Sequence, residues 1–170
     1  MKFKVVPEPR PLSFVREAAR TLPLVPGTED DCCARLMADA GLPSRDAARE
    51  WLTFLRALGL LAESDGKFYQ TRADLTDEDL ARAFRERIHG ASTVLDALAT
   101  SKEPLTPAAA YGRVRETIPR WERSRRTDWE RVWRERVERI LEWAVVLDLA
   151  TRVEAADEGE DEAPRYRAAE

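Results

Sequence analysis

Amphipathic helices separated by short turns dominate the first 60 residues of the chain. Thr28 precedes an acidic first turn, and apolar residues then recur at steps of three and four as far as Gly41. Ser44 precedes a second such run, which stops at Gly59. The apolar side of that second run consists of Ala47, Ala48, Trp51, Leu52, Leu55 and Leu58. The pattern predicts two helices joined by a short turn.

Two strand-like runs follow the second helix. Residues 60–63 and 67–71 flank the turn residues at 64–66, which predicts a β-hairpin. Residues 12–22 predict a helix at the start of this half, after a proline-rich arm at 7–11. Residues 1–6 are expected to add a strand to the same sheet.

The end of the second helix and the hairpin together carry a family resemblance. The stretch at 55–61, followed by 68–71, resembles the end of the recognition helix and the wing of archaeal and bacterial winged-helix regulators. The resemblance covers roughly a quarter of the chain and rests on pattern rather than on an invariant motif. It implies a winged helix-turn-helix domain over residues 1–74 and suggests DNA binding, although many winged helices bind protein instead.

The second half repeats the order of helices and a hairpin. Helices are expected over 76–87, 91–99, 106–114 and 127–145, the last of them opened by a capping box at 127–130. A strand over 147–153 pairs with residues 165–167 in this interpretation, so that the acidic segment between them forms a wing. The fold class is therefore mainly α with small β-hairpins, as two winged helix-turn-helix domains in tandem. Residues 75–153 form the second domain, and 154–170 form an acidic wing tip or tail. The alternative is a helical dimerisation extension with a disordered acidic tail.

Composition narrows the class of protein. The net charge is −4, and residues 154–170 alone carry two basic and seven acidic groups. The strongly basic footprint of many nucleic-acid binders is therefore absent. No segment approaches the length of a membrane span, and no secretory leader is evident, so a cytoplasmic location is expected. Arginine greatly exceeds lysine and isoleucine is rare, which suggests a GC-rich genome and suits a salt-loving archaeon.

The exposed side of the second helix supplies the first set of candidate DNA contacts. Arginine binds guanine at two points in the major groove, and basic side chains at a wing contact phosphates. The candidates in this half are Ser44, Arg45, Arg49, Thr53, Arg56, Lys67 and Arg72. The alternative is a solvated helix face, since Asp46 and Glu50 alternate with the arginines.

The second set lies in the connection before the longest helix. It consists of Arg120, Arg123, Arg125 and Arg126, with Trp121 among them as a side chain able to stack or wedge. On the long helix itself, Glu130 with Arg134 and Glu135 with Arg139 have the spacing of surface ion pairs.

Enzymatic chemistry finds little support in the residues. His89 is the single histidine, and the chain has no glycine-rich phosphate loop and no nucleophile elbow. Cys32 and Cys33 are adjacent on one helix and are expected to be core thiols. We therefore expect no catalytic residues, no metal and no cofactor.

Two functions fit these observations. The first is a DNA-binding transcriptional regulator whose partner is double-stranded DNA, with a homodimer or a protein partner also compatible. The second is a winged-helix interaction subunit of a chromosome-segregation, replication or transcription complex. Near-neutral winged-helix pairs of this size are similar to the small subunits that clasp kleisin, and this likeness rests on architecture alone.

The acidic segment generates the first testable prediction. Six acids lie within nine residues: Glu154, Asp157, Glu158, Glu160, Asp161 and Glu162. If the protein binds DNA, these charges oppose phosphate approach. Replacing all six with Ser or Asn should then raise nonspecific DNA affinity in a binding titration, most strongly at low salt, where screening is weakest. Unchanged or weaker binding by a folded variant would contradict this role.

Overall fold

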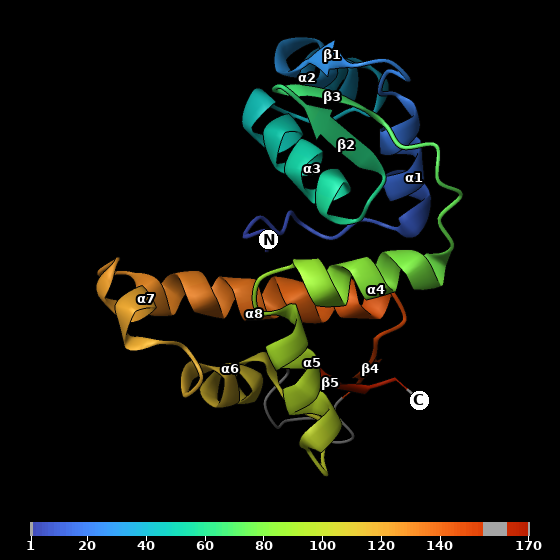
Figure 1. Ribbon diagram of the computed structural model, residues 1–170. Coiled ribbons are helices and arrows are strands. Elements are labelled where there is room, and N and C mark those ends of the chain that lie inside the picture. The colour runs from blue at the N-terminus through green and yellow to red at the C-terminus, as the bar shows by residue number, and fades with distance from the viewer. Residues whose placement is uncertain (1, 155–162, 170) are drawn as a thin grey trace. The chain divides into compact units, whose positions relative to one another are not determined.

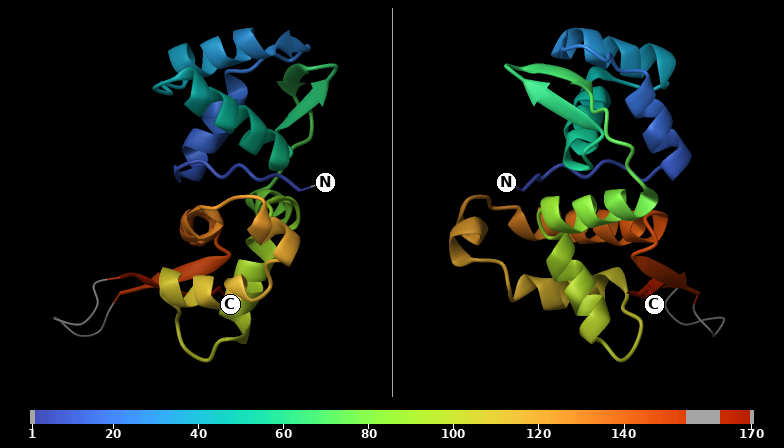
Figure 2. Two further views of the ribbon diagram at one scale, coloured as in Figure 1. Left: turned by 90° about the vertical axis from the view of Figure 1, so that its left-hand side faces the viewer. Right: turned by 45° about the vertical axis from the view of Figure 1, so that its right-hand side comes forward.

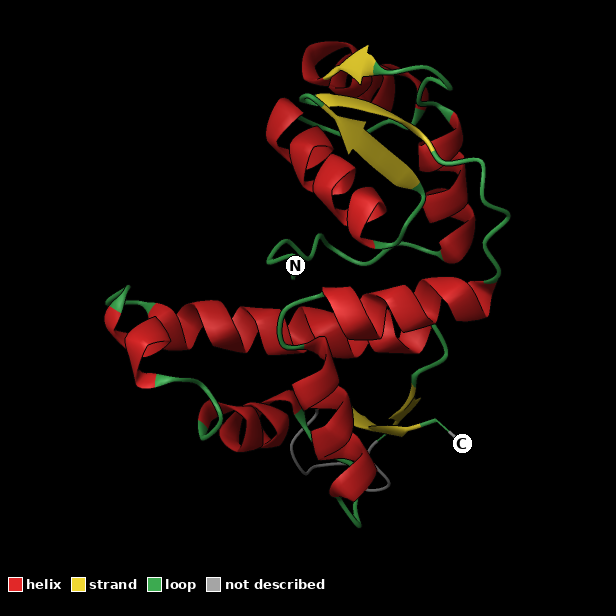
Figure 3. Cartoon of the chain, viewed as in Figure 1, coloured by secondary structure: helices red, strands yellow, loops and turns green. Residues whose placement is uncertain are grey.

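The chain forms two compact units, residues 1–89 and residues 90–170. The structure is a computed structural model that describes residues 2–154 and 163–169 (Figure 1). Helices supply most of each unit, and the strands are short (Figure 3). The predicted boundary after residue 74 lies before a helix, α4 (Asp77–Arg87), that belongs to the first unit.

The first unit has the element order of a winged helix. The helices are α1 (Leu12–Arg20), α2 (Glu29–Asp39) and α3 (Arg45–Ala57), with the two-residue strand β1 (Gly27–Thr28) just before α2. The hairpin of β2 (Leu61–Ser64) and β3 (Lys67–Gln70) then completes a three-stranded antiparallel sheet in the order β1-β3-β2. Its turn is built by Asp65 and Gly66, both at positive φ, the backbone that a tight two-residue hairpin requires.

Side-chain caps fix where α2, α3 and α4 of the first unit begin. The hydroxyl of Thr28 accepts a hydrogen bond from the Asp31 amide, and the hydroxyl of Ser44 accepts one from the Ala47 amide, each 3.1 Å long. Thr76 forms a reciprocal capping box with Asp79 at the start of α4. These caps confirm the helix starts expected from the sequence.

The core of the first unit lies between α1, α2 and α3. Val15, Cys32, Leu36 and Leu55 are fully buried, and Trp51 is only 3% exposed. Both cysteines are free and buried, and burial raises the pKa of Cys32 to about 11, so this thiol stays protonated and packs as a small apolar side chain. Met37, an apolar residue at helical spacing in α2, is 39% exposed.

The N-terminal segment does not join the wing sheet, contrary to the prediction for residues 1–6. Phe3 forms a parallel bridge with Ile88 at the end of α4, where the Phe3 amide donates to the Arg87 carbonyl at 2.7 Å. The third strand of the sheet is β1, which sequence reasoning missed because two residues show no alternating pattern.

The second unit repeats the order of the first. Its helices are α5 (Ala91–Thr100), α6 (Pro107–Arg115), the short α7 (Arg120–Ser124) and α8 (Trp129–Val146). The strands β4 (Ala150–Val153) and β5 (Arg165–Ala168) pair in antiparallel fashion, with Arg152 opposite Tyr166. Leu105 bridges Tyr166, as β1 bridges β3 in the first unit.

The pairing of β5 with β4 contradicts the alternative of a helical extension followed by a disordered tail. The predicted wing tip at 155–162 lies outside the described residues. The capping box predicted at 127–130 is wrong, because Asp128 is the N-cap and makes no side-chain capping bond. Asp128 instead binds Arg126 and Arg131.

Among the described residues, no helix combines the length and the hydrophobicity that crossing a bilayer would require.

Burial of the tryptophans generates the second prediction. Trp51 packs edge-on against Phe14 and Phe54, with ring centroids 5.1 and 5.7 Å apart, and Trp133 is 6% exposed. Trp51 and Trp133 each lie on an apolar helical stripe, and both indoles are buried. Trp51→Ala should lower the free energy of unfolding by about 3–5 kcal/mol in urea denaturation. Trp121→Ala is the control, since this indole is 59% exposed and should cost no more than about 0.5 kcal/mol. Equal losses would refute the helix register.

Candidate nucleic-acid interface

The third helix of the first unit carries the predicted DNA contacts. Only residues 40–44 separate α2 from α3, and Gly41 takes a positive φ (73°) within that turn. The β2–β3 hairpin lies against α3 (Figure 2). Burial of one side of α3 leaves the opposite side, with its arginines, toward solvent. This is the arrangement in which a winged helix presents its recognition helix and wing.

Two of the predicted residues are occupied by backbone hydrogen bonds. Ser44 caps α3, as described above, and the Thr53 hydroxyl donates to the Arg49 carbonyl at 3.2 Å. Both hydroxyls therefore support the helix.

Arg45 and Arg49 form ion pairs with the first turn of α2. The Arg49 Nε lies 2.6 Å from a Glu29 carboxylate oxygen, and Arg45 pairs with Asp30. The hydrogen bond with Glu29 raises the pKa of the Arg49 guanidinium above its ordinary value, so the group stays charged. The two arginine side chains remain 53% and 55% exposed. These partners lie across the helix-turn-helix, not on α3, where the sequence placed Asp46 and Glu50.

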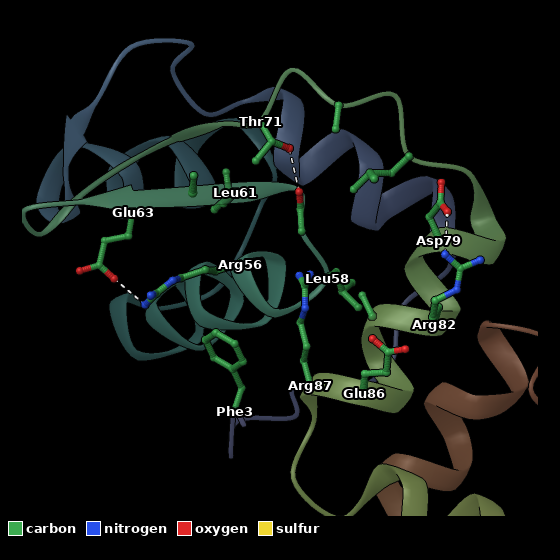
Figure 4. Close-up of a pocket in the computed structure, with 15 residues that line it drawn as sticks. Phe3, Arg56, Leu58, Leu61, Glu63, Thr71, Asp79, Arg82, Glu86 and Arg87 are labelled. Atoms are coloured by element: carbon green, nitrogen blue, oxygen red, sulfur yellow. Dashed lines mark hydrogen bonds and ion pairs between the residues drawn. The ribbon is translucent and has the colours of Figure 1, made fainter. Parts of the chain in front are cut away.

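Arg56 pairs with strand β2 of the wing hairpin. Its Nη1 lies 2.5 Å from a Glu63 carboxylate oxygen, and its guanidinium stands over the Phe3 ring at 5.5 Å from the centroid. Arg56 and Glu63 line an open pocket of about 830 Å³ that also includes Arg82 and Arg87 of α4 (Figure 4). Arg56 is therefore held more firmly than Arg45 or Arg49.

The wing presents two cationic side chains. Lys67 opens β3 next to the hairpin turn, and Arg72 follows β3; both are exposed. Within residues 2–154 and 163–169, neither makes a hydrogen bond or ion pair through its side chain. Each is free to meet a phosphate.

Of the four predicted arginines in the second unit, two bind groups of the chain itself, and two are exposed without an ion pair among the described residues. Arg123 donates to the carbonyls of Ile118 and Arg115, at 3.1 and 2.6 Å, and so closes the end of α6. Arg126 pairs with Asp128 at 2.9 Å. Arg120 is exposed at the start of α7, and Arg125 stands 5.5 Å from the centroid of the exposed Trp121 ring.

In the order of elements, α8 is the counterpart of α3, because each helix comes directly before the strands of its unit. The predicted arginines at 120–126 lie in the segment that precedes α8. The exposed surface of α8 is of mixed charge: Arg131 pairs with Asp128 and lies 3.9 Å from Glu135. Glu130 pairs with Arg115 of α6 at 2.9 Å instead of the predicted Arg134, which stands over the Tyr111 ring. Sequence spacing could not reveal these contacts because both partners come from another helix.

The described residues hold no cluster of three or more His, Cys, Asp or Glu side chains of the kind that binds a metal ion.

Comparison with known families agrees with this architecture. A family model, the halobacterial double winged helix domain, matches residues 1–163. The chain therefore belongs to that family, a class of winged-helix proteins, and the tandem arrangement and archaeal character predicted from the sequence are confirmed. No curated protein and no solved structure matches the chain.

The capping role of Ser44 generates the third prediction. Ser44→Ala removes the acceptor for the Ala47 amide and should lower the free energy of unfolding by about 1 kcal/mol, whereas Ser44→Gly should cost only a few tenths. Thermal or urea unfolding of the two variants measures the difference. A stability loss that is equal in both variants, or absent in both, would show that the cap contributes nothing to the fold.

Proposed function

We propose that the protein binds double-stranded DNA and acts in the cytoplasm as a transcriptional regulator. The observation that carries this proposal is the pair Arg45 and Arg49. They lie four residues apart in the first half of α3, half exposed, on the helix that follows the turn. Early residues of such a helix meet base edges in the major groove.

The chemistry of the surface supports this choice. A guanidinium donates two hydrogen bonds to the O6 and N7 atoms of guanine, and exposed ion pairs are weak enough to be exchanged for such contacts. Lys67 and Arg72 would contact phosphates on either side of the groove and fix the orientation of the domain.

The second unit offers a different set of contacts. Arg120 begins α7 and Arg125 follows it, and both are exposed, as is the Trp121 indole. In this proposal the arginines bind the sugar-phosphate backbone, and Trp121 packs against it or against a base step. Arg123 and Arg126 instead bind groups of the chain itself, the carbonyls of Ile118 and Arg115 and the Asp128 carboxylate, and so support the connection between α6 and α8.

The near-neutral charge shapes the expected binding. A protein of net charge −4 gains little from long-range attraction to DNA, so its affinity depends on the local contacts. Nonspecific affinity is accordingly expected to be low.

A protein-interaction subunit is the second candidate function. Leu24 and Val25, in the loop between α1 and β1, are 63% and 69% exposed. Two adjacent exposed apolar side chains of this size favour a protein partner. Leu24→Ser with Val25→Ser would leave DNA binding unchanged if the first proposal is right, and would abolish partner capture if the second is.

The fourth prediction tests the DNA proposal directly. Arg45→Ala and Arg49→Ala should each weaken binding to a mixed-sequence duplex by about 1–3 kcal/mol where the residue contacts a base, with little change in thermal stability. Fluorescence anisotropy across a salt series measures the affinity. Arg82→Ala is the control, because Arg82 is an exposed, ion-paired arginine on α4. Absence of binding by the parent protein at low ionic strength would overturn the proposal.

A further inference from the structure

The first turn of α2 bears directly on the arginines of the recognition helix. Glu29 pairs with Arg49, and Asp30 pairs with Arg45, so two successive acids of α2 hold two arginines one helical turn apart on α3. Thr28 caps this turn and fixes its backbone. Asp31, the next acid, pairs instead with Arg35 on its own helix, at 2.9 Å.

These ion pairs are weak enough for another anion to replace the carboxylates. Glu29 and Asp30 are 40% and 74% exposed, and water weakens an exposed ion pair to at most about 1 kcal/mol. The acids also lie at the positive end of the α2 dipole, where the free amides of a helix N-terminus would otherwise attract a phosphate. The turn therefore offers DNA a repelling surface while it occupies the arginines.

We propose that Glu29 and Asp30 are intramolecular competitors of DNA for Arg49 and Arg45, so that DNA binding by α3 is an exchange of carboxylate for nucleic acid. This inference rests on the proposed function and deepens it by naming residues that lower affinity. In this inference the Glu29–Arg49 and Asp30–Arg45 ion pairs do more than stabilise the fold.

The exchange has a consequence for salt dependence. Each DNA phosphate that a cation neutralises releases about 0.9 of a counterion, which makes affinity fall as salt rises. When Arg45 and Arg49 leave their carboxylates, Glu29 and Asp30 take up cations from solution. This uptake offsets the release from DNA, so the two arginines add little to the salt slope of the parent protein.

The experiment compares three isosteric variants with the parent protein: Glu29→Gln, Asp30→Asn and the matched control Asp31→Asn. All three remove one negative charge from the same turn, but only the first two release an arginine of α3. Affinity for one mixed-sequence duplex is measured by fluorescence anisotropy over a salt series, and circular dichroism melts verify folding. Asp30→Asn serves alone if Glu29→Gln unfolds, since Asp30 is the more exposed side chain.

We expect Glu29→Gln and Asp30→Asn each to bind about two- to fivefold more tightly at low salt. The slope of log K against log salt should steepen in each variant, by up to about 0.9 where the released arginine also neutralises a phosphate, while Asp31→Asn stays near the parent. Equal tightening in all three variants would reduce the effect to net charge and overturn the inference. Weaker binding by the first two would show that the carboxylates position the arginines, which also overturns it.

Outcomes for the two proposals are separable. If the parent binds DNA and the first two variants match Asp31→Asn, the inference fails and the proposed function stands. If the parent does not bind but Glu29→Gln or Asp30→Asn does, competition is supported, whereas DNA binding by the unmodified chain is not. Absence of binding in every protein overturns both.

Discussion

Burial of one side of α3 is the constraint on which the first unit depends. Trp51, Leu52 and Leu55 are withdrawn from water, and each apolar side chain buried in this way contributes on the order of 1.5–3 kcal/mol. Because helical geometry ties the remaining positions to that stripe, the same burial turns Arg45 and Arg49 toward solvent. The chemistry of the candidate interface is therefore set by the hydrophobic core beneath it, and a change of register would remove both together.

Ion pairs within the first unit determine which partners the arginines of the candidate interface can bind. Arg45, Arg49 and Arg56 each meet a carboxylate from another element, Asp30, Glu29 and Glu63 respectively. A basic helix would attract any polyanion, whereas this one presents charge only to a partner that competes successfully with its own acids. The balance disfavours loose association along DNA and favours contacts with well-placed acceptors. With this balance, a net charge of −4 is compatible with the proposed function.

The sequence pattern predicted those features of the fold that depend on residues close together in the chain. Capping residues, apolar periodicity and turn residues located the helices at 29, 45, 77 and 107 and both hairpins, because each signal lies within a few residues of the feature it specifies. Pairings between distant segments were missed: β1 with β3, Phe3 with Ile88, and Glu130 with Arg115. The candidate arginines were found by their exposed positions. Their acidic partners were not, since Glu29 precedes Arg49 by 20 residues and meets it only through the turn between helices.

The two units share one order of elements but present different surfaces. In the first, five residues join the second and third helices, and the exposed arginines lie on the third helix itself. In the second, residues 116–128 make that connection, long enough to hold α7 with its exposed Trp121. Arg123 donates to the carbonyls of Ile118 and of Arg115, the last residue of α6, whereas Arg120 and Arg125 are exposed. The candidate arginines thus lie at different places in the two units, on α3 in the first and around α7 in the second. If the proposed function holds, the two units are suited to unlike contacts rather than to two copies of one contact.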